Sequence, residues 1–324
     1  MSKSSKKYIL GVDVGATSVK MGLVDANGRI LSRALFQTKA FASKDAFVKE
    51  LIKQMRALLK KSGTGKNKLA GIGVGLPGRV DFKKGIVHDL TNIKGWNEVP
   101  LKKILYKIFK TAIYLDNDAN AFASGQLIWG KARVARNAVC ITLGSGVGGG
   151  LIIEGEVFRG SNFSAGEIGH VCIDINGPSC GCGANGCLES FVGNRYIASR
   201  AIEKIKKGQK TLLTKLVNGD LKKITPELIT RAARQRDAFS VKLWEQTGTY
   251  LGIGLSGIVN IINPDMVIVG GGLSKAGKFI FKPLNRELKK RAMRQHLKVL
   301  KVQNADFNDD AGVIGAASLL ERER

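Results

Sequence analysis

A short pattern that occurs twice constrains the fold of this chain more than any other feature of its sequence. Apolar residues over 8–14 lead into a turn at 15–17, and a second apolar run follows over 19–24. About 130 residues later, apolar residues over 138–143 lead into a glycine-rich turn at 144–150, after which apolar residues resume. Apolar runs joined by tight turns are typical of antiparallel strands. The repeat predicts a duplicated lobe whose glycine turns face one cleft.

The segments around this repeat predict a mixture of helices and strands. Helical spacing of apolar residues, or a helix-compatible composition, is found at 46–59, 194–207, 227–236, 237–262 and 311–320. Strand-like runs at 69–76 and 266–269 end at glycine-containing turns. This order favours an α/β fold. We predict a first lobe over 1–115, closed by a C-terminal helix at 311–324, and a larger second lobe over 116–310 that carries a dimer surface.

Length and charge exclude several classes of protein. The chain has 324 residues, 44% of them apolar, which is more than one compact unit usually contains. No run of about 18 apolar residues could span a bilayer, and the first seven residues are too short and polar for a signal peptide, so we expect a cytoplasmic protein without membrane contact. The net charge is +26, but the basic residues come as scattered pairs without interleaved aromatic residues. This distribution favours a solvated cationic surface over a nucleic-acid partner, for which residues 287–301 would be the best candidate.

The glycine turns are candidates for holding phosphates. Glycine lets backbone N–H groups approach a phosphate closely, and the hydroxyls of Thr17, Thr142 and Ser145 add donors beside the turns. The spacing of glycines in 144–150 imitates a dinucleotide-binding fingerprint, but that fingerprint must open a helix, whereas a strand follows here. A plain hairpin remains the alternative for each turn. The third turn, 270–272, follows a strand and could pass under an adenine or ribose.

One aspartate is the candidate general base. The strand-like segment 113–118 ends in polar residues, and small residues over 119–125 begin a helix. Asp118 would therefore lie at a helix N-terminus, where the helix dipole favours its ionised form. An ionised carboxylate can take the proton of a hydroxyl that attacks a phosphoryl group. Taken alone, an aspartate at this position is more often a helix cap than a base.

A group of cysteines predicts a metal site. Of the five cysteines, Cys180, Cys182 and Cys187 lie within eight positions, and His170 precedes them by ten residues. An odd number of cysteines without a secretion signal argues against disulfides, and one histidine with three cysteines is a typical structural zinc set. The alternative is a reduced loop without metal. Zinc would fix the nearby Glu167 and Glu189, and two fixed carboxylates are a typical grip on sugar hydroxyls.

Eight stretches of the sequence together resemble the family of bacterial repressors, sugar kinases and open reading frames known as ROK, especially its glucokinase-type members. They are GVDVGATSVK from Gly11, GVGLPGRVD from Gly73, TNIKGW from Thr91, DNDANAFASG from Asp116, LGSGVGGG from Leu143, GEIGHVCID from Gly166, CGCGANGCLE from Cys180 and IVGGGLS from Ile268. The resemblance implies an actin-like ATPase (ribonuclease H-like) fold with two lobes around a cleft. It also implies a homodimer or dimer of dimers, and transfer of phosphate from Mg-ATP to the 6-hydroxyl of a hexose.

The same resemblance implies roles for individual residues. Asp118 would be the base, and Asp13 would orient Mg²⁺ through water. The residues implied to hold the sugar are Gly78, Asn92, Asn117, Asp118, Glu167, His170 and Glu189. Those implied to hold ATP are Asp13, Gly15, Ala16, Thr17, Lys20, Gly144, Ser145, Gly146, Gly148, Gly270, Gly271 and Gly272. The implied zinc ligands are His170, Cys180, Cys182 and Cys187. The sequence departs from the family's common pattern at Ala16, where glycine is frequent, and at Ser145, where threonine is frequent.

Three alternatives stay open at this stage. Members of the same family act as sugar-responsive transcriptional repressors, but these carry an N-terminal helix-turn-helix domain, whereas the first predicted strand begins at Tyr8. Polyphosphate could replace ATP as the donor, which a cationic surface would suit. Glucose is the first choice of hexose, and N-acetylmannosamine, N-acetylglucosamine, mannose and fructose are the others.

Overall fold

The computed structural model describes residues 7–38, 41, 43–65, 68–90, 93 and 95–321. The chain forms two compact units. The first contains the chain up to residue 136, residues 150–166 and the chain from residue 305 onward, and the second contains residues 137–149 and 167–304. The boundary that the sequence predicts near residue 115 lies inside the first unit, because the strand that ends there belongs to the first unit's sheet.

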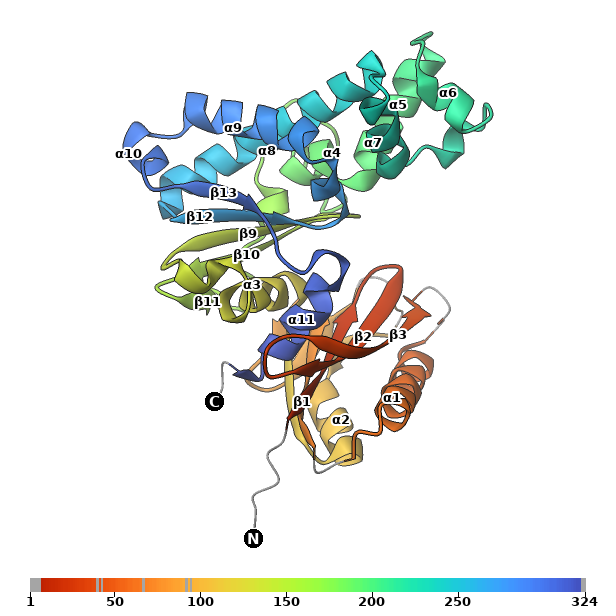
Figure 1. Ribbon diagram of the computed structural model, residues 1–324, viewed down its shortest axis with the longest axis vertical. Helices are drawn as coiled ribbons and strands as arrows, with labels where there is room; N and C mark the ends of the chain where they lie inside the picture. Colours follow the sequence, from red (N-terminus) through yellow and green to blue (C-terminus); the bar gives the residue numbers. More distant parts are fainter. Residues whose placement is uncertain are drawn as a thin grey trace. The chain divides into compact units, whose positions relative to one another are not determined.

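The first unit is built on a five-stranded sheet with helices on both faces (Figure 1). Its strands, in spatial order, are β3 (Ile30–Gln37), β2 (Ser18–Asp25), β1 (Tyr8–Val14), β4 (Leu69–Leu76) and β8 (Ala112–Asn117). β1 is antiparallel to β2 and parallel to β4, and β4 is parallel to β8. The carboxyl ends of β1, β4 and β8 therefore lie at one edge of the sheet.

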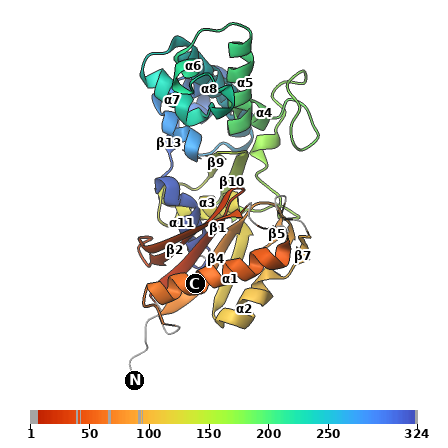
Figure 2. The same cartoon turned by 90° about the vertical axis from the view of Figure 1, so that its right-hand side faces the viewer.

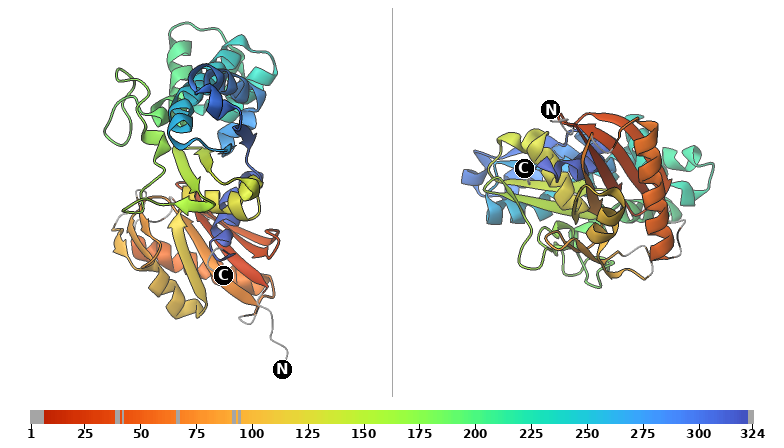
Figure 3. Two further views of the ribbon diagram at one scale, coloured as in Figure 1. Left: turned by 90° about the vertical axis from the view of Figure 1, so that its left-hand side faces the viewer. Right: turned by 90° about the horizontal axis from the view of Figure 1, so that it is seen from below.

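Alternate residues of β1 enter two different cores. Leu10 packs in the core that contains Leu51 of α1 (Lys44–Lys61), and this core also contains residues of α2 (Leu101–Phe109). Ile9 packs with Ala317 of α11 (Ala311–Ser318) on the other face. The view from below in Figure 3 shows the orange helix α1 beside the red strands β1 to β3. The period of two along a strand explains why neighbouring residues serve opposite faces.

α11 lies directly on the backbone of the sheet because glycines form the floor beneath it. Gly11 is paired in register with Gly22 on β2 and with Gly73 on β4. A Cβ atom added at Gly73 would lie 1.8 Å from the Ala316 carbonyl oxygen. Only residues without a side chain allow so close an approach, so this row of glycines fixes the place of α11.

A further helix, α3 (Asp118–Ile128), packs against α11 through small residues. The Ser318 hydroxyl donates to Ser124 Oγ at 2.8 Å, and a Cβ atom at Gly125 would lie 2.8 Å from the Gly315 Cα. The unit also has a small antiparallel sheet of β5 (Val80–Asp81), β6 (Ile86–Asp89) and β7 (Asn97–Val99).

The second unit has a parallel core of β9 (Ala138–Leu143), β12 (Met266–Gly270) and β13 (Lys301–Asn304). They belong to a sheet of order β11-β10-β9-β12-β13, in which β10 (Val147–Ile153) is antiparallel to β11 (Glu156–Phe158). β10 begins in the second unit and ends in the first. The carboxyl ends of β9 and β12 lie side by side, with Gly270 opposite Thr142.

Helices form much of the remaining second unit. They are α4 (Leu188–Val192), α5 (Asn194–Lys206), α6 (Leu212–Leu216), α7 (Pro226–Arg234), α8 (Ala238–Ile262), α9 (Lys278–Arg291) and α10 (Arg294–Leu297). α8 and α9 pack closely because Gly248 has no side chain; a Cβ atom there would lie 2.4 Å from the Ile280 carbonyl oxygen. α5, α6 and α7 gather near α8 (Figure 2). In the described part of the chain, no helix combines the length and the apolar character needed to cross a membrane.

Most predicted elements agree with the structure, and one does not. The predicted strands at 8–14, 69–76 and 138–143 have the observed bounds. The predicted turn at 144–150 is too long, because β10 begins at Val147 and includes Gly148. Gly150 serves packing instead of turning, since a Cβ atom there would lie 2.6 Å from the Ala119 carbonyl oxygen.

Candidate functional site

The first unit brings several predicted site residues to the edge where its parallel strands end. Gly15 follows β1, Gly78 follows β4, and Asn117 and Asp118 close β8 and open α3. In register, Leu76 lies opposite Asn117. The topology therefore assembles residues that are up to about a hundred positions apart in the sequence, as is general for the carboxyl edge of parallel strands.

Asp118 lies in the first turn of α3, but the helix cap is its neighbour. Asn117 Oδ1 accepts hydrogen bonds from the N–H groups of Ala119 at 2.9 Å and Asn120 at 3.3 Å. Asp118 Oδ1 accepts from the Ala119 N–H at 2.8 Å. The capping function that competes with a catalytic role is thus carried by Asn117, and the helix dipole favours an ionised Asp118.

Gly78 is hydrogen-bonded to Asn117, in the turn between β8 and α3. Its carbonyl oxygen accepts a hydrogen bond from Asn117 Nδ2 at 3.1 Å. Its φ angle is +91°, and a Cβ atom there would lie 2.4 Å from Asp89 Oδ1. Both the left-handed backbone and the close approach require glycine at this position.

Asp13 is the acidic group at the end of β1. It pairs in register with Lys20 on β2, and a Cβ atom at Gly312, in the first turn of α11, would lie 2.2 Å from its Oδ2. Burial raises the pKa of Asp13 to about 6, and the charge of Lys20 opposes that rise. Lys20 Nζ also donates to the Asp309 carbonyl oxygen at 3.2 Å. Asp13 thus places a carboxylate at the end of β1, and Mg²⁺ takes carboxylate oxygens as ligands, directly or through water.

The turn at 15–17 closes the hairpin between β1 and β2. The Gly15 N–H donates to the Ser18 carbonyl oxygen at 3.0 Å, and Thr38 Oγ1 donates to the Gly15 carbonyl oxygen at 2.8 Å. The Thr17 side chain is exposed and Ala16 is half-buried. The turn thus has a fixed backbone with an exposed hydroxyl.

In the second unit, two glycine turns follow neighbouring parallel strands. Gly144 and Gly146 follow β9, and Gly271 follows β12. Gly271 has a φ angle of +85°, and a Cβ atom there would lie 2.3 Å from the Leu143 carbonyl oxygen. The two turns are therefore packed backbone to backbone at one edge of the sheet.

A hollow of about 350 Å³ lies beside the second of these turns. Its lining includes Gly272 with Arg231 and Arg234 of α7 and Trp244 of α8. The indole N–H of Trp244 is buried and has no hydrogen-bond partner among the described residues. Basic and aromatic side chains around a glycine turn fit a flat ligand that carries phosphates.

Glu189 connects the first glycine turn with the cysteine loop. It lies in the first turn of α4, and its Oε2 accepts a hydrogen bond from the Val147 N–H at 2.9 Å. A Cβ atom at Gly146 would lie 2.5 Å from the same oxygen. Glycine at 146 is thus required for the carboxylate to reach the turn.

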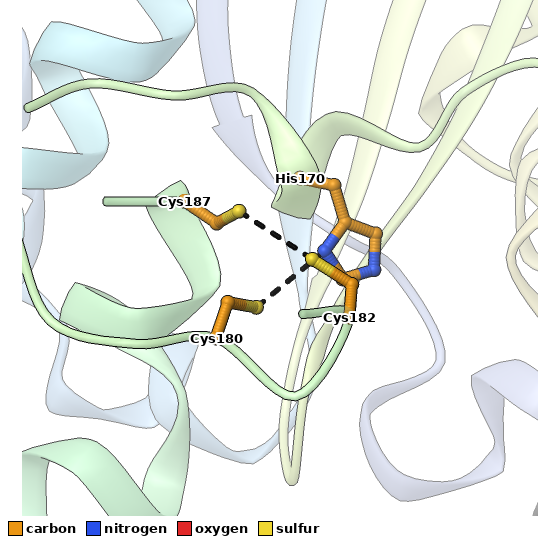
Figure 4. Close-up of side chains that lie close together, drawn as sticks. All are labelled: His170, Cys180, Cys182 and Cys187. Carbon is orange, nitrogen blue, oxygen red and sulfur yellow. Dashed lines mark hydrogen bonds between the residues drawn. The ribbon is translucent and has the colours of Figure 1, made fainter. Parts of the chain in front are cut away.

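The cysteine loop gathers the four predicted metal ligands (Figure 4). The ligand atoms of His170, Cys180, Cys182 and Cys187 all lie within 4.8 Å of one another. Cys182 Sγ and Cys187 Sγ are 3.7 Å apart, and Cys180 Sγ lies 3.7 Å from His170 Nδ1. Tetrahedral zinc with Zn–S bonds of about 2.3 Å separates two sulfurs by about 3.8 Å, so the distances and the donor set fit zinc.

His170 faces the sulfur atoms with one ring nitrogen and an acidic residue with the other. Its Nε2 lies 3.9 Å from Glu167 Oε2, and Glu167 is exposed. A histidine that binds metal through Nδ1 keeps Nε2 for a carboxylate or a ligand, which fixes the ring orientation.

Some predicted site residues lie outside the turns or outside the described part of the chain, and other residues that the sequence did not predict lie beside the candidate site. Asn92 lies outside the described residues, and Gly148 lies within β10 and not in the turn. The sequence interpretation missed Arg231 and Trp244, which line the hollow beside Gly272. They lie inside helices without any local motif, so only the tertiary packing identifies them. The Gly312 contact with Asp13 was also missed, because nearly three hundred positions separate the two residues.

Two α/β units, each with glycine or polar turns at the carboxyl edge of parallel strands, define the two-lobe actin-like ATPase fold. The ROK family model matches residues 9–323, and the chain belongs to the ROK family. It is 33% identical to a glucokinase of Thermotoga maritima over 98% of each chain. It is 30% identical to a xylose repressor of Caldicellulosiruptor bescii over 96% of this chain and 77% of the repressor.

The chain is also similar to a solved structure of the same family over nearly its whole length. The chain superposes on a ROK family glucokinase from Streptomyces griseus, solved in complex with glucose and AMPPNP, with a TM-score of 0.86. The two are 30% identical, and the match covers 97% of this chain and 99% of the other.

Proposed function

We propose that this protein is an ATP-dependent sugar kinase of the glucokinase type, which transfers the terminal phosphoryl group of ATP to the 6-hydroxyl of a hexose, glucose first. Membership of the ROK family and the similarity to named glucokinases over nearly the whole chain support this proposal. The products are hexose 6-phosphate and ADP. Phosphoryl transfer of this kind needs a base for the hydroxyl, held phosphates and charge neutralisation.

The observation that carries the proposal is the turn that bears Asp118. Its carboxylate lies at the N-terminus of α3 while Asn117 provides the helix cap. One oxygen of Asp118 accepts a hydrogen bond from the Ala119 N–H at 2.8 Å, which holds the carboxylate at the start of the helix. Asp118 takes the proton of the 6-hydroxyl as the oxygen attacks the phosphoryl group, which requires the ionised form that the helix dipole favours.

In this proposal Asn117, the Gly78 backbone, Glu167, His170 and Glu189 hold the sugar hydroxyls. Support comes from the Glu189 carboxylate, which is oriented by the Val147 N–H, and from the exposed position of Glu167. Ionised carboxylates accept strong hydrogen bonds from hydroxyl groups. Asn92 stays a prediction.

The nucleotide would be held by backbone groups of the glycine turns. The turn residues Gly15, Ala16, Thr17, Gly144, Ser145 and Gly146 would donate N–H or hydroxyl groups to the phosphates. The residues 270–272 and the hollow beside them would hold adenine and ribose. Lys20 would neutralise phosphate charge, and Asp13 would hold Mg²⁺ through water. Gly148 would take part through its backbone in β10.

Zinc would be held by His170 Nδ1 and by the thiolates of Cys180, Cys182 and Cys187, and its role would be structural. A closed Cys₃His set leaves no open position for a reacting group. The metal-bound loop would fix the orientation of the His170 ring and the start of α4, and with them Glu167 and Glu189. The sugar grip in the second unit thus depends on a folded loop.

The proposal also includes the location of the reaction and the oligomeric state of the protein. We place the reaction in the cytoplasm, which supplies ATP. We also propose a homodimer or a dimer of dimers, for which Ile261 and Met293 are candidate contacts in the second unit. Both are exposed apolar residues, and the Met293 N–H donates to Asn260, the neighbour of Ile261, at 2.9 Å. Light scattering of Ile261→Lys against the unchanged protein tests this interface.

The kinase proposal is tested by coupled ADP release across a panel of hexoses. We expect turnover with glucose and ATP, and a loss of kcat of about 10²- to 10⁴-fold in Asp118→Asn, with hexose binding still measurable by calorimetry. Asp45→Asn, which changes an exposed aspartate at the start of α1, is the matched control and should leave kcat unchanged.

Three outcomes would contradict the proposal. Undiminished turnover of Asp118→Asn would refute the assigned base. Turnover with polyphosphate but not with ATP would refute the donor. Hexose binding without any turnover would indicate a sugar-sensing protein of the repressor class.

A further inference from the structure

A buried ion pair lies immediately beside the turn that bears the proposed base. Arg159 donates to Asp116 Oδ2 from Nε at 2.9 Å and from Nη2 at 2.6 Å. The Asp116 side chain is 2% exposed and that of Arg159 is 15% exposed. Both residues belong to the first unit, and 43 positions separate them. A two-donor arginine–carboxylate pair of this length fixes orientation as well as distance.

The second oxygen of Asp116 is bonded to the turn itself. Asp116 Oδ1 accepts from the N–H of Asn117 at 2.8 Å and from Asn120 Nδ2 at 3.3 Å. Asn117 in turn caps α3, and Asn120 lies in its first turn. The Asp116 carboxylate thus accepts four hydrogen bonds, two from Arg159 and two from the residues on either side of Asp118.

Arg159 is itself held in place on its other side. Its guanidinium carbon lies 4.2 Å from the centre of the Phe82 ring, and its Nη1 donates to the Val157 carbonyl oxygen at 3.0 Å. Phe82 packs edge to face against Phe163, with ring centres 5.4 Å apart. Stacking on an aromatic face and three hydrogen bonds leave the guanidinium little freedom to turn toward another ligand.

Stability alone does not explain such a pair. Two well-packed apolar residues often stabilise a protein as well as a buried ion pair does, because desolvation offsets the attraction of the charges. What the ion pair adds is a defined geometry at the end of β8. A misplacement of about 1 Å at a reacting group can cost about 100-fold in rate.

We propose that Arg159 is a positioning residue for Asp118, and that it acts through Asp116 and the bonds of Asp116 to Asn117 and Asn120. The proposal rests on the assignment of Asp118 as the base. Arg159 makes no contact with substrate in this account. Its loss lets the start of α3 move, so that Asp118 meets the hydroxyl in fewer productive orientations while substrates still bind.

The test compares Arg159→Met, Asp116→Asn and the double variant with the unchanged protein. In Arg159→Met we expect kcat to fall about 100-fold, with the KM for hexose and for ATP changed by less than about threefold. The melting temperature should also fall, because the variant leaves a buried carboxylate unpaired. In the double variant the melting temperature should recover, since no buried charge remains, while kcat stays low.

Arg136→Met is the matched control. It removes an arginine of the same unit that pairs with Glu154 at the surface, and it should change neither kcat nor melting temperature appreciably. Hydrogen exchange gives a readout that does not depend on turnover. Amides of the peptide that spans the start of α3 should exchange faster in Arg159→Met and in the double variant, and not in Arg136→Met.

Each other outcome would overturn the inference. Recovery of kcat together with stability in the double variant would show that Arg159 only neutralises a buried charge. A large rise in the KM for ATP in Arg159→Met would indicate direct contact with phosphate. If the amides at the start of α3 exchange at the same rate in Arg159→Met as in the original protein, the positioning role is refuted, whatever the turnover. If the original protein turns over no hexose, the proposed function is refuted separately.

Discussion

The two units hold their candidate site residues by different means. In the first unit, Asp118 lies in a turn fixed by side chains of the protein, and its sheet supports α11 on a floor of glycines such as Gly73. In the second unit, Glu189 is oriented by a backbone N–H, and the loop before it contains the ligand set of a metal. The first arrangement depends on packing within the protein, whereas the second would depend on an added ion.

The base, the phosphate-binding turns and the metal-ligand loop of a kinase are each held by a different kind of interaction. A base needs a rigid position and a controlled charge, which buried hydrogen bonds provide. Phosphates need closely spaced backbone donors, which glycine turns provide. A short loop with few buried apolar residues of its own needs a cross-link to stay folded, which a bound metal provides. Perturbing each support should therefore affect a different property of the enzyme.

The largest expected effect is on the packing of the first unit. Gly73→Ala should lower the free energy of unfolding by about 3 kcal/mol, because the new methyl group would collide with the Ala316 carbonyl oxygen and displace α11. Gly257→Ala is the matched control. Gly257 is exposed in α8, none of the described residues outside its own stretch of the helix lies within 4 Å of an added Cβ atom there, and the substitution should stabilise slightly. Urea unfolding measures both. Equal stability of the two variants would contradict the glycine floor.

The next effect should fall on the sugar site of the second unit alone. Cys182→Ser should abolish stoichiometric zinc and raise the KM for hexose by about 10- to 100-fold, with the KM for ATP nearly unchanged. Cys172→Ser, which changes an exposed cysteine outside the ligand set, is the control. Elemental analysis and steady-state kinetics report the two properties. Full zinc content in Cys182→Ser would refute the ligand assignment.

The glycine turn after β9 sharpens the comparison, because it serves both substrates in the proposal. Gly146→Ala should raise the KM for hexose and for ATP by about tenfold each, since its methyl group would push the Glu189 carboxylate away from Val147. Gly144→Ala should raise the KM for ATP only, because in the described part of the chain no atom outside the turn lies within 4 Å of the new methyl group. Steady-state kinetics of both variants measure the two KM values. If Gly146→Ala raised the KM for ATP alone, Glu189 would not belong to the sugar site.

The smallest effect is a pH dependence that belongs to the first unit. The pKa of Asp13 is raised to about 6, so its ionised form is lost as the pH falls through that value. Binding of Mg-nucleotide should weaken about fourfold between pH 7 and pH 5.5, beyond the change that the nucleotide's own titration causes. Asp13→Asn shows the nucleotide's contribution alone. An identical pH dependence in both proteins would remove Asp13 from the magnesium site.

The same pKa shift has a consequence for stability of the opposite sign. The folded protein binds the proton of Asp13 more tightly than the unfolded chain does. Stability without ligands should therefore decrease as the pH rises from about 4 to about 6, as far as this group is concerned. Asp13→Asn should remove this decrease.

Local patterns in the sequence were sufficient to predict much of the fold. Apolar runs located β1, β4 and β9 with their observed bounds. Helical spacing located α1, and a helix-compatible composition located α8, within two residues at each end. The turn after β9 was predicted too long, because glycines that permit close packing and glycines that permit turning look alike in a sequence. Gly150 is of the first kind, and only the contact with α3 shows it.

The candidate site could be predicted where chemistry and spacing occur together. The cysteines and His170 lie close in sequence, and the structure brings them together. Asp118 follows directly on a strand, so the sequence could single it out, and its role stays a prediction. Arg159, Trp244 and Gly312 were not found from the sequence, because each acts across a distance along the chain that no local pattern records. Residues that hold a site in place are therefore harder to predict than the residues that form it.

The most direct test of the account is a crystal structure with glucose and a non-hydrolysable ATP analogue bound together. We expect an Asp118 carboxylate oxygen within about 3.2 Å of the glucose 6-hydroxyl, with that hydroxyl facing the terminal phosphate. A bound glucose whose 6-hydroxyl lies more than about 5 Å from Asp118, with no water between them, would contradict it.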